Sequence, residues 1–166
     1  MASNKMVTVL WFDIGQAREA AEFYARTFPD THVDEKIASP TDTPSGPAGQ
    51  EILVNFTLCG QPFAGLNGGS NFKPNESVSF QIFTEDQEET DRLWNAVVGN
   101  SGEESACGWC KDKWGYSWQI TPRILIDAIS SSDRAAAKRA MDAMLQMKKI
   151  DVARIEAAYK GETADA

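Results

Sequence analysis

The chain has 166 residues, of which 42% are hydrophobic and 24% are charged. This composition is typical of a globular protein and argues against a disordered or fibrous chain. The formal net charge is −8 and the pI is near 4.7, so we expect no nucleic-acid partner. No apolar run reaches membrane-spanning length and the N-terminus lacks the pattern of a secretory signal, so we expect no membrane partner. An odd number of cysteines, three, favours a reducing compartment, and we expect a cytoplasmic protein.

The single histidine limits the possible chemistry. His32 lies in the turn-like segment FPDTHVDE. A Ser-His-Asp triad would have to use this residue, and a zinc site with several histidines is excluded. An exposed position is the simpler expectation for it.

The first half of the chain predicts a strand, a helix and three further strands. The apolar run over 6–12 predicts a buried strand. A helix is expected over about 16–28, because alanines and aromatic residues recur there at helical spacing. Further strands are expected near 33–37, 51–59 and 62–66. Between the second and third strands, the segment ASPTDTPSGPAG (38–49) predicts a long irregular loop of the kind that can act as a lid.

The second half repeats this plan. A strand is expected over 77–83, a helix over about 86–98, and a hairpin over 107–122. Asp112-Lys113-Trp114-Gly115 supplies the turn of the hairpin. The alternation after it predicts one polar face and one apolar face. Thr121-Pro122 is expected to close the last strand and open a helix, with threonine as the cap.

A helical tail follows the second repeat. Helices are expected over 122–129, then from the cap Ser132-Asp133 as far as Lys148-Lys149, and finally after the cap Asp151. The apolar stripe of the middle helix is expected to consist of Ala137, Ala140, Met141, Met144 and Leu145. A methionine-rich amphipathic tail packs either on its own sheet or on a second subunit, and we expect a homodimer.

Together these elements predict a single α+β domain. It contains paired βαβββ modules, module one over 5–66 and module two over 77–121, and a helical tail over 122–160. Two such modules are expected to form a curved mixed sheet around a shared cleft.

Five ordered segments resemble one known family. They are LWFDIGQAREAAEFYARTFPD, LCGQPFAGLNGG, FKPNESVSFQIFTEDQEE, CGWCKDKWGYSWQITP and AMLQMKKIDVARIEAAY. In this order they resemble the PhnB-like family, often labelled demethylubiquinone methyltransferase-like, of the glyoxalase/bleomycin-resistance/dioxygenase (vicinal oxygen chelate) superfamily. The resemblance implies the paired βαβββ fold and a dimer, and it implies no well-defined biochemical role.

The same resemblance implies where a metal ion would bind. Metal enzymes of the superfamily place histidine, glutamine or glutamate on the first strand of each module and glutamate on the last. Here Gln119 falls at the glutamate position, while the first strands offer Ser77 or Ser79 and Val7, Thr8 or Val9. Neutral glutamine, serine and valine are poor ligands for a divalent ion, so we expect no catalytic metal and no cofactor.

Other motifs are weak. Cys107-Gly-Trp-Cys110 matches a C-x-x-C pattern, but we interpret it as a coincidence, because it lies in a predicted strand and lacks a second pair. Asn67-Gly68-Gly69-Ser70 lacks the following lysine and helix of a phosphate loop. The methyltransferase label is not supported by any Gly-rich strand-to-helix loop.

The polar positions of both modules predict a site for a small, weakly polar molecule. The expected ligand-binding residues are Trp11, Asn55, Thr57, Ser77, Ser79, Gln81, Trp109 and Gln119. Gln119, Ser79 and Asn55 would orient the ligand, and the tryptophans would pack on it. An enzyme of the glyoxalase or dioxygenase type is the alternative, with Glu51 or Asp112 as acid or base. A pure assembly module built on the methionine-rich helix is a third possibility.

Overall fold

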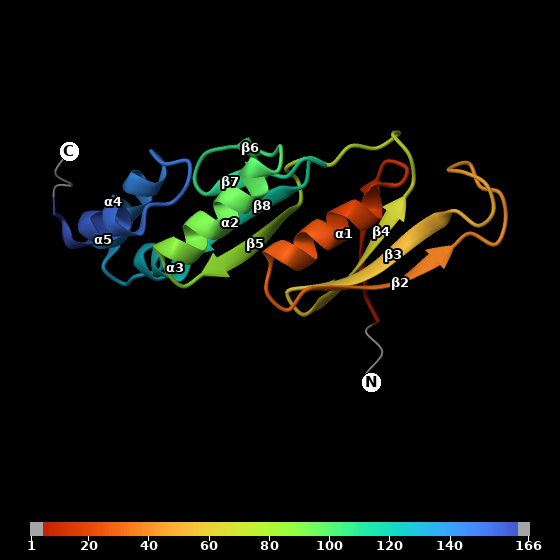
Figure 1. Ribbon diagram of the computed structural model, residues 1–166. Coiled ribbons are helices and arrows are strands. Elements are labelled where there is room, and N and C mark those ends of the chain that lie inside the picture. Colours follow the sequence, from red (N-terminus) through yellow and green to blue (C-terminus); the bar gives the residue numbers. More distant parts are fainter. Residues whose placement is uncertain (1–4, 163–166) are drawn as a thin grey trace. The chain divides into compact units, whose positions relative to one another are not determined.

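The computed structural model describes residues 5–162, which form two compact units that divide between Pro74 and Asn75. Each unit contains the predicted βαβββ order, so the α+β fold of paired modules is confirmed (Figure 1). The first unit comprises β1 (Thr8–Phe12), α1 (Gln16–Thr27), β2 (His32–Ala38), β3 (Glu51–Leu58) and β4 (Gln61–Asn67). The second comprises β5 (Ser79–Thr84), α2 (Gln87–Gly99), β6 (Glu103–Glu104), β7 (Trp109–Lys111) and β8 (Ser117–Pro122), followed by α3 (Arg123–Ile129), α4 (Arg134–Met144) and α5 (Val152–Lys160).

The two sheets have the same topology. The strand order is β1-β4-β3-β2 in the first and β5-β8-β7-β6 in the second. In each, the first strand pairs in parallel with the last strand of its module, and the other neighbours are antiparallel. The repeat inferred from the sequence is therefore a repeat of topology.

One face of each sheet is covered by the helix of its own module. In the first unit, the fully buried Tyr24 of α1 packs against Phe56 of β3. In the second, Leu93 and Trp94 of α2 are buried, as are Trp118 and Ile120 of β8. Burying this apolar area is the main favourable term for folding each module. It leaves the opposite face of each sheet available for a site.

The first strand differs from its prediction. It begins at Thr8 rather than Met6, and it alternates instead of being buried throughout. Leu10 and Phe12 face the covered side, whereas the side chain of Val9 is 57% exposed. An apolar run in a sheet with one covered face can bury only every second residue.

The tail is helical as predicted, with two corrections. The helix after Pro122 begins at Arg123, and Thr121 lies in β8 instead of capping the helix. α4 ends at Met144, before the two lysines, and it buries Ala136, Ala137 and Ala140 while Met141 and Leu145 are exposed. Small side chains on the inner face let α4 approach its neighbours closely, so the larger ones lie outside. The caps Asp133 and Asp151 are confirmed.

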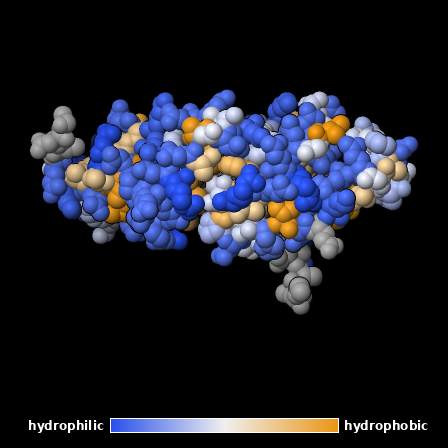
Figure 2. Space-filling model, in the orientation of Figure 1, coloured by the Kyte–Doolittle hydropathy of each residue, from blue (hydrophilic) through white to orange (hydrophobic). Residues whose placement is uncertain are grey.

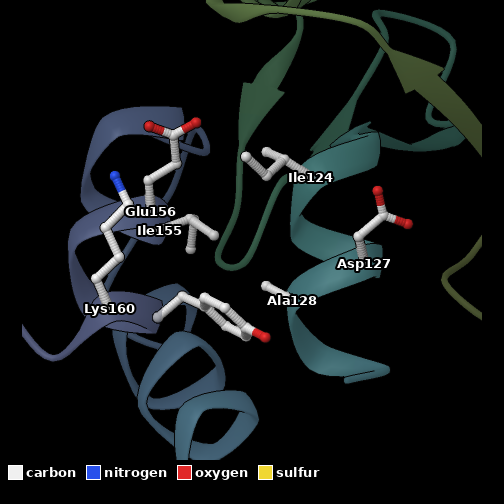
Figure 3. A pocket seen from close by; sticks show the side chains of 7 residues that line it. Ile124, Asp127, Ala128, Ile155, Glu156 and Lys160 are labelled. Atoms are coloured by element: carbon white, nitrogen blue, oxygen red, sulfur yellow. The ribbon is translucent and has the colours of Figure 1, made fainter. Parts of the chain in front are cut away.

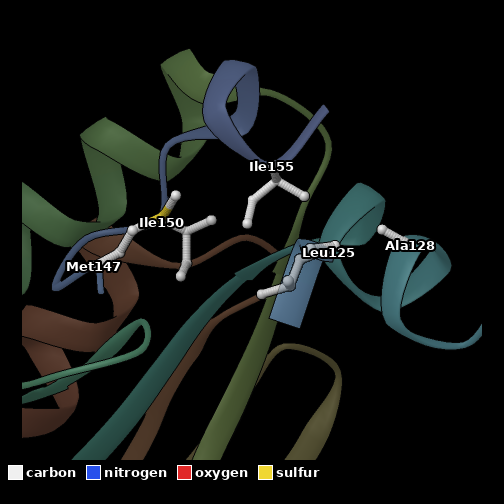
Figure 4. Close-up of a cluster of buried hydrophobic side chains, with 6 residues drawn as sticks. Leu125, Ala128, Met147, Ile150 and Ile155 are labelled. Atoms are coloured by element: carbon white, nitrogen blue, oxygen red, sulfur yellow. The ribbon is translucent and has the colours of Figure 1, made fainter. Parts of the chain in front are cut away.

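The tail has a hydrophobic cluster of its own and is attached to the second sheet. Leu125, Ala128, Ala140, Met147, Ile150 and Ile155 form the cluster (Figure 4). The backbone N–H groups of Cys107 and Gly108 donate to the carbonyl oxygens of Met147 and Lys148 at 2.8 and 2.7 Å. The side chain of Gln87 in α2 bonds the Ile150 carbonyl and the Val152 N–H. These contacts hold the segment between α4 and α5 at the start of β7.

The surface seen in Figure 2 is largely hydrophilic and carries separate apolar patches. Among residues 5–162, no helix is both long and apolar enough to span a bilayer. The long loop expected over 38–49 lies over 39–50, between β2 and β3, and turns hold it in place: Ser39 N–H donates to the Gln50 carbonyl, and Thr43 pairs with Gly46.

Candidate functional site: the open face of the second sheet

Three long side chains lie side by side on the uncovered face of the second sheet. Gln81 of β5 is in register with Gln119 of β8, which is in register with Trp109 of β7. Residues paired across neighbouring strands point to the same side of a sheet. The register therefore brings together the two glutamines and the tryptophan that the sequence analysis assigned to the site.

Both glutamines use their amino groups within the sheet. Gln119 Nε2 donates to Ser79 Oγ at 2.8 Å, and Gln81 Nε2 donates to Thr121 Oγ1 at 3.2 Å. These bonds fix the orientation of both amides. The carbonyl oxygen of each amide, with its two lone pairs, is left to accept hydrogen bonds from a ligand.

The neighbouring row contains a buried hydroxyl without a partner. Ser117 is in register with Ser79 on one side and Lys111 on the other. The Ser117 side chain is only 1% exposed, and within the described residues its Oγ makes no hydrogen bond. Leaving such a group unbonded costs about 1–3 kcal/mol, so a hydrogen-bond partner at this hydroxyl would be favourable. The sequence alternation placed Ser117 on this face, but its burial could not be read from the pattern.

Lys111 adds a charge that is already offset. Its ammonium group pairs with the Glu76 carboxylate, and this hydrogen bond raises the pKa of Lys111 and lowers the pKa of Glu76. The negative charge of Glu103 on β6 also raises the pKa of Lys111. The face is thus polar without a strong field of one sign, which suits an uncharged ligand.

Ser77 does not share this face. The strand begins at Ser79, and Ser77 lies before it in a turn, where its backbone N–H and its hydroxyl both bond to Asn75 Oδ1. The sequence extended the alternation two residues too far, because an asparagine-led turn breaks the pattern. Its predicted place on the face is wrong.

The other predicted residues lie on the open face of the first sheet. Asn55 is in register with Ala64, and Ala64 with Val9, while Trp11 is in register with Leu66. Thr57 pairs with Pro62 and His32, and His32 is exposed as expected. This face is mainly apolar, with Asn55, Thr57 and His32 as polar positions.

Trp11 is held in place by its surroundings. Its indole Nε1 donates to the Gly69 carbonyl at 2.7 Å, and its ring meets Phe72 edge-on at a centroid distance of 4.8 Å. An added Cβ at Gly68 would lie 2.3 Å from the Trp11 ring. The Gly-rich turn after β4 therefore packs against the Trp11 ring, and it is not a phosphate loop.

The two candidate acids are occupied by structural contacts. The Glu51 carboxylate receives hydrogen bonds from Arg18 at 2.8 to 3.1 Å. Asp112 is buried, and its carboxylate accepts from Trp114 N, Tyr116 N and Trp118 Nε1 at 2.9 to 3.0 Å. Asp112 thus organises the hairpin turn, and its bonds leave no evident proton-transfer role.

The donor set does not fit a resident metal ion. Among residues 5–162, no group of three or more His, Cys, Asp or Glu side chains could hold a cation together. On the second sheet, the amide of Gln119 is bonded to Ser79 and the row beside it includes the ammonium group of Lys111. A hydroxyl, an amide and a nearby cation form a poor site for a divalent ion.

The C-x-x-C pair does not form a reactive pair. Cys107 has a positive φ in the turn before β7, Cys110 lies within β7, and both thiols are free. Burial, reinforced by the Asp112 carboxylate, raises the pKa of Cys110 to about 12. The thiol, not the nucleophilic thiolate, is thus the stable form of Cys110 near neutral pH.

This pKa predicts the reactivity of Cys110. At pH 8 only roughly 10⁻⁴ of it is thiolate, so alkylation by iodoacetamide in the folded protein should be far slower than after unfolding in guanidinium. Mass spectrometry of tryptic peptides measures both rates. Cys110 reacting in the folded protein as fast as in the unfolded one, or a Cys107–Cys110 disulfide in the purified protein, would contradict the structural reading.

Comparison with known proteins agrees with this architecture. Paired βαβββ modules define a class of fold, and in this fold the chain resembles a fosfomycin resistance protein, FosX, from Listeria monocytogenes (TM-score 0.51, 12% identity, 74% of this chain and 93% of that one). A protein from Pseudomonas aeruginosa is similar with a TM-score of 0.58 and 16% identity, over 72% of this chain and 98% of that one. Within this class, the chain belongs to the family described as 3-demethylubiquinone-9 3-methyltransferase, whose model matches residues 4–121.

A PhnB protein from Bacillus cereus is similar in both sequence and fold. The identity is 29% and the TM-score is 0.62, over 72% of this chain and 99% of that one. No curated protein matches the chain. The family inferred from the sequence segments is thus confirmed.

Proposed function

We propose that the open face of the second sheet binds a small, uncharged organic molecule that carries a ring and hydroxyl or amino donors. The observation that carries this proposal is the set of unused acceptors. Both glutamines donate their amino groups to neighbouring hydroxyls, so their carbonyl oxygens are left to accept hydrogen bonds from a ligand, and among the described residues the Ser117 hydroxyl has no hydrogen-bond partner. Trp109, in the same row, supplies an aromatic surface.

The proposal includes binding without a catalytic metal. Its support is the donor set of Gln119, Ser79 and Ser117, which suits hydrogen bonds to an organic ligand better than coordination. An enzyme activity is less well supported, because Glu51 and Asp112, the carboxylates considered for proton transfer, are engaged by Arg18 and by the hairpin turn. A homodimer remains part of the proposal and rests on the family.

The test compares two probes with the same ring. Resorcinol carries two hydroxyl donors, and 1,3-dimethoxybenzene carries none. Isothermal titration calorimetry is expected to show at least fivefold tighter binding of resorcinol, because each hydrogen bond to a carbonyl is worth about 1 kcal/mol. The side-chain amide signals of Gln81 and Gln119 should shift on titration in NMR spectra.

Gln119→Leu should weaken resorcinol binding by roughly five- to tenfold, because it removes an acceptor and leaves Ser79 free to rotate. Gln146→Leu, at an exposed position after α4, is the matched control and should bind as the parent does. Thermal melts establish that both variants fold. Equal affinity for the two probes, no effect of Gln119→Leu, or stoichiometric zinc, nickel or iron in the purified protein would each refute the proposal.

A further inference from the structure

A second cavity lies in the helical tail, beyond the segment that the family model matches. That match ends at residue 121, and α3 and α5 come later in the chain. Between these two helices is a cavity of about 290 Å³. This volume is close to the lower end of the range for small-molecule sites.

One part of the cavity wall is apolar or aromatic. Ile124 and Ala128 come from α3, and Ile155 and Tyr159 come from α5 (Figure 3). Ile155 is fully buried and belongs to the cluster that holds the tail together. The small side chain of Ala128 leaves the space, and the Tyr159 hydroxyl is fixed by a 2.8 Å hydrogen bond to Ser131 Oγ. The tyrosine ring thus forms an ordered aromatic wall.

Charged groups line the same cavity from both helices. Asp127 belongs to α3, and Glu156 and Lys160 belong to α5 (Figure 3). Within residues 5–162 none of the three has an ion-pair partner closer than 4.0 Å. Two carboxylates and one ammonium group give this cavity a net charge of about −1 at neutral pH.

We propose that this cavity binds a small organic monocation, an amine with a compact apolar body. The apolar part would occupy the space between Ile124, Ile155 and the Tyr159 ring. The ammonium group would lie at the rim of the cavity, where the net negative charge of Asp127, Glu156 and Lys160 attracts a cation. Lys160 balances one of the carboxylates, so the site matches a single positive charge. This site is separate from the face of the second sheet and does not depend on the function proposed there.

Three probes of similar shape and different charge test the proposal. Phenethylamine is the cation, 2-phenylethanol is neutral and 3-phenylpropionate is the anion. Methyl NMR spectra of the full chain should show phenethylamine shifting the signals of Ile124 and Ile155. Its dissociation constant is expected to be at least fivefold lower than that of 2-phenylethanol, and 3-phenylpropionate is expected to bind most weakly.

Matched variants separate charge from shape. Asp127→Asn and Glu156→Gln should each weaken phenethylamine binding by about two- to fivefold, as expected for charges that water still reaches, and leave 2-phenylethanol binding unaffected. Asp142→Asn on α4, outside the cavity, and Gln119→Leu on the second sheet should leave phenethylamine binding unchanged. Ala128→Leu fills the space and should abolish binding of all three probes.

Other outcomes would overturn the proposal. They are equal affinity for the amine and the alcohol, tight binding of the carboxylate, or binding that survives the loss of both carboxylates. Occupation of the cavity by a second copy of the chain would also overturn it. That case would appear as a dimer that persists in Asp127→Asn and Glu156→Gln and that phenethylamine does not dissociate. Because the two charge-removing variants alter an exposed side chain, Asp127, and a half-buried one, Glu156, the test does not depend on the stability of Ala128→Leu.

Discussion

Replacing Asp112 by alanine is expected to lower the free energy of unfolding by about 3–5 kcal/mol. The buried carboxylate of Asp112 accepts from two backbone N–H groups of the hairpin turn and from the indole of Trp118. Trp118 is fully buried, so its indole N–H would lose the Asp112 acceptor in a place that water does not reach. Charge-assisted hydrogen bonds to a carboxylate are also stronger than neutral ones. Urea unfolding followed by fluorescence measures the change.

The variant Asp112→Asn refines this experiment. Its amide can keep one acceptor oxygen but turns an amino group towards one of the three donors, so it should destabilise the protein by less than alanine and by more than 1 kcal/mol. Asp142→Ala, at an exposed helical position paired only with Lys138, is the control and should change stability by about 0.5 kcal/mol or less. A loss at Asp112 no larger than at Asp142 would show that the turn does not depend on the carboxylate.

The prominence of Asp112 shows what the sequence could predict about the fold. The Asp-x-x-Gly spacing predicted the turn, and Gly115 N–H does donate to the Asp112 carbonyl at 3.0 Å. Alternation placed Val54, Phe56 and Leu58 on the covered face of β3, where they are buried. These features depend on neighbours in the chain, and local patterns report local geometry.

Features set by distant contacts were not predictable in the same way. The apolar pattern of β1 could not reveal that its sheet is covered on one side only, so Val9 was assigned to the interior. The inner face of α4 is chosen by packing against α5 and α3, which selects the alanines over Met141 and Leu145. Asp112 itself was considered as an acid or base, because its partners Tyr116 and Trp118 are brought to it only by the folded hairpin.

The same distinction between local and distant contacts applies to the candidate site on the second sheet. The sequence placed Gln81, Trp109 and Gln119 correctly on one face, because a period of two fixes the side of a strand. It could not tell which atoms of the amides remain unused, since that depends on Ser79 and Thr121, which lie diagonally across the neighbouring strand from Gln119 and Gln81. The choice between donors and acceptors determines the class of ligand. The chemical preference of this face is therefore a property of strand pairing and not of any single motif.

Replacing Gly108 by alanine is expected to destabilise the protein by about 2–4 kcal/mol and to loosen the tail. Gly108 has φ +82, where an alanine costs about 1 kcal/mol. An added Cβ would also lie 2.9 Å from the Ile120 carbonyl oxygen and 3.1 Å from Ile150 Cγ1. Overpacking of this kind costs a further 1–3 kcal/mol. Gly108 N–H donates to the Lys148 carbonyl, so a shift of the Gly108 backbone would also displace the segment between α4 and α5.

Gly60→Ala separates the two contributions. Gly60 has a similar φ of +74, and an added Cβ there would meet no atom within 4 Å, so only the backbone cost of about 1 kcal/mol is expected. The difference between the two variants in urea unfolding is the cost of crowding Ile120 and Ile150. Limited trypsin digestion should also cleave after Lys148 and Lys149 faster in Gly108→Ala than in Gly60→Ala, because displacement of Ile150 exposes that segment. Equal stability and equal cleavage in the two variants would mean that the tail is not held through Gly108.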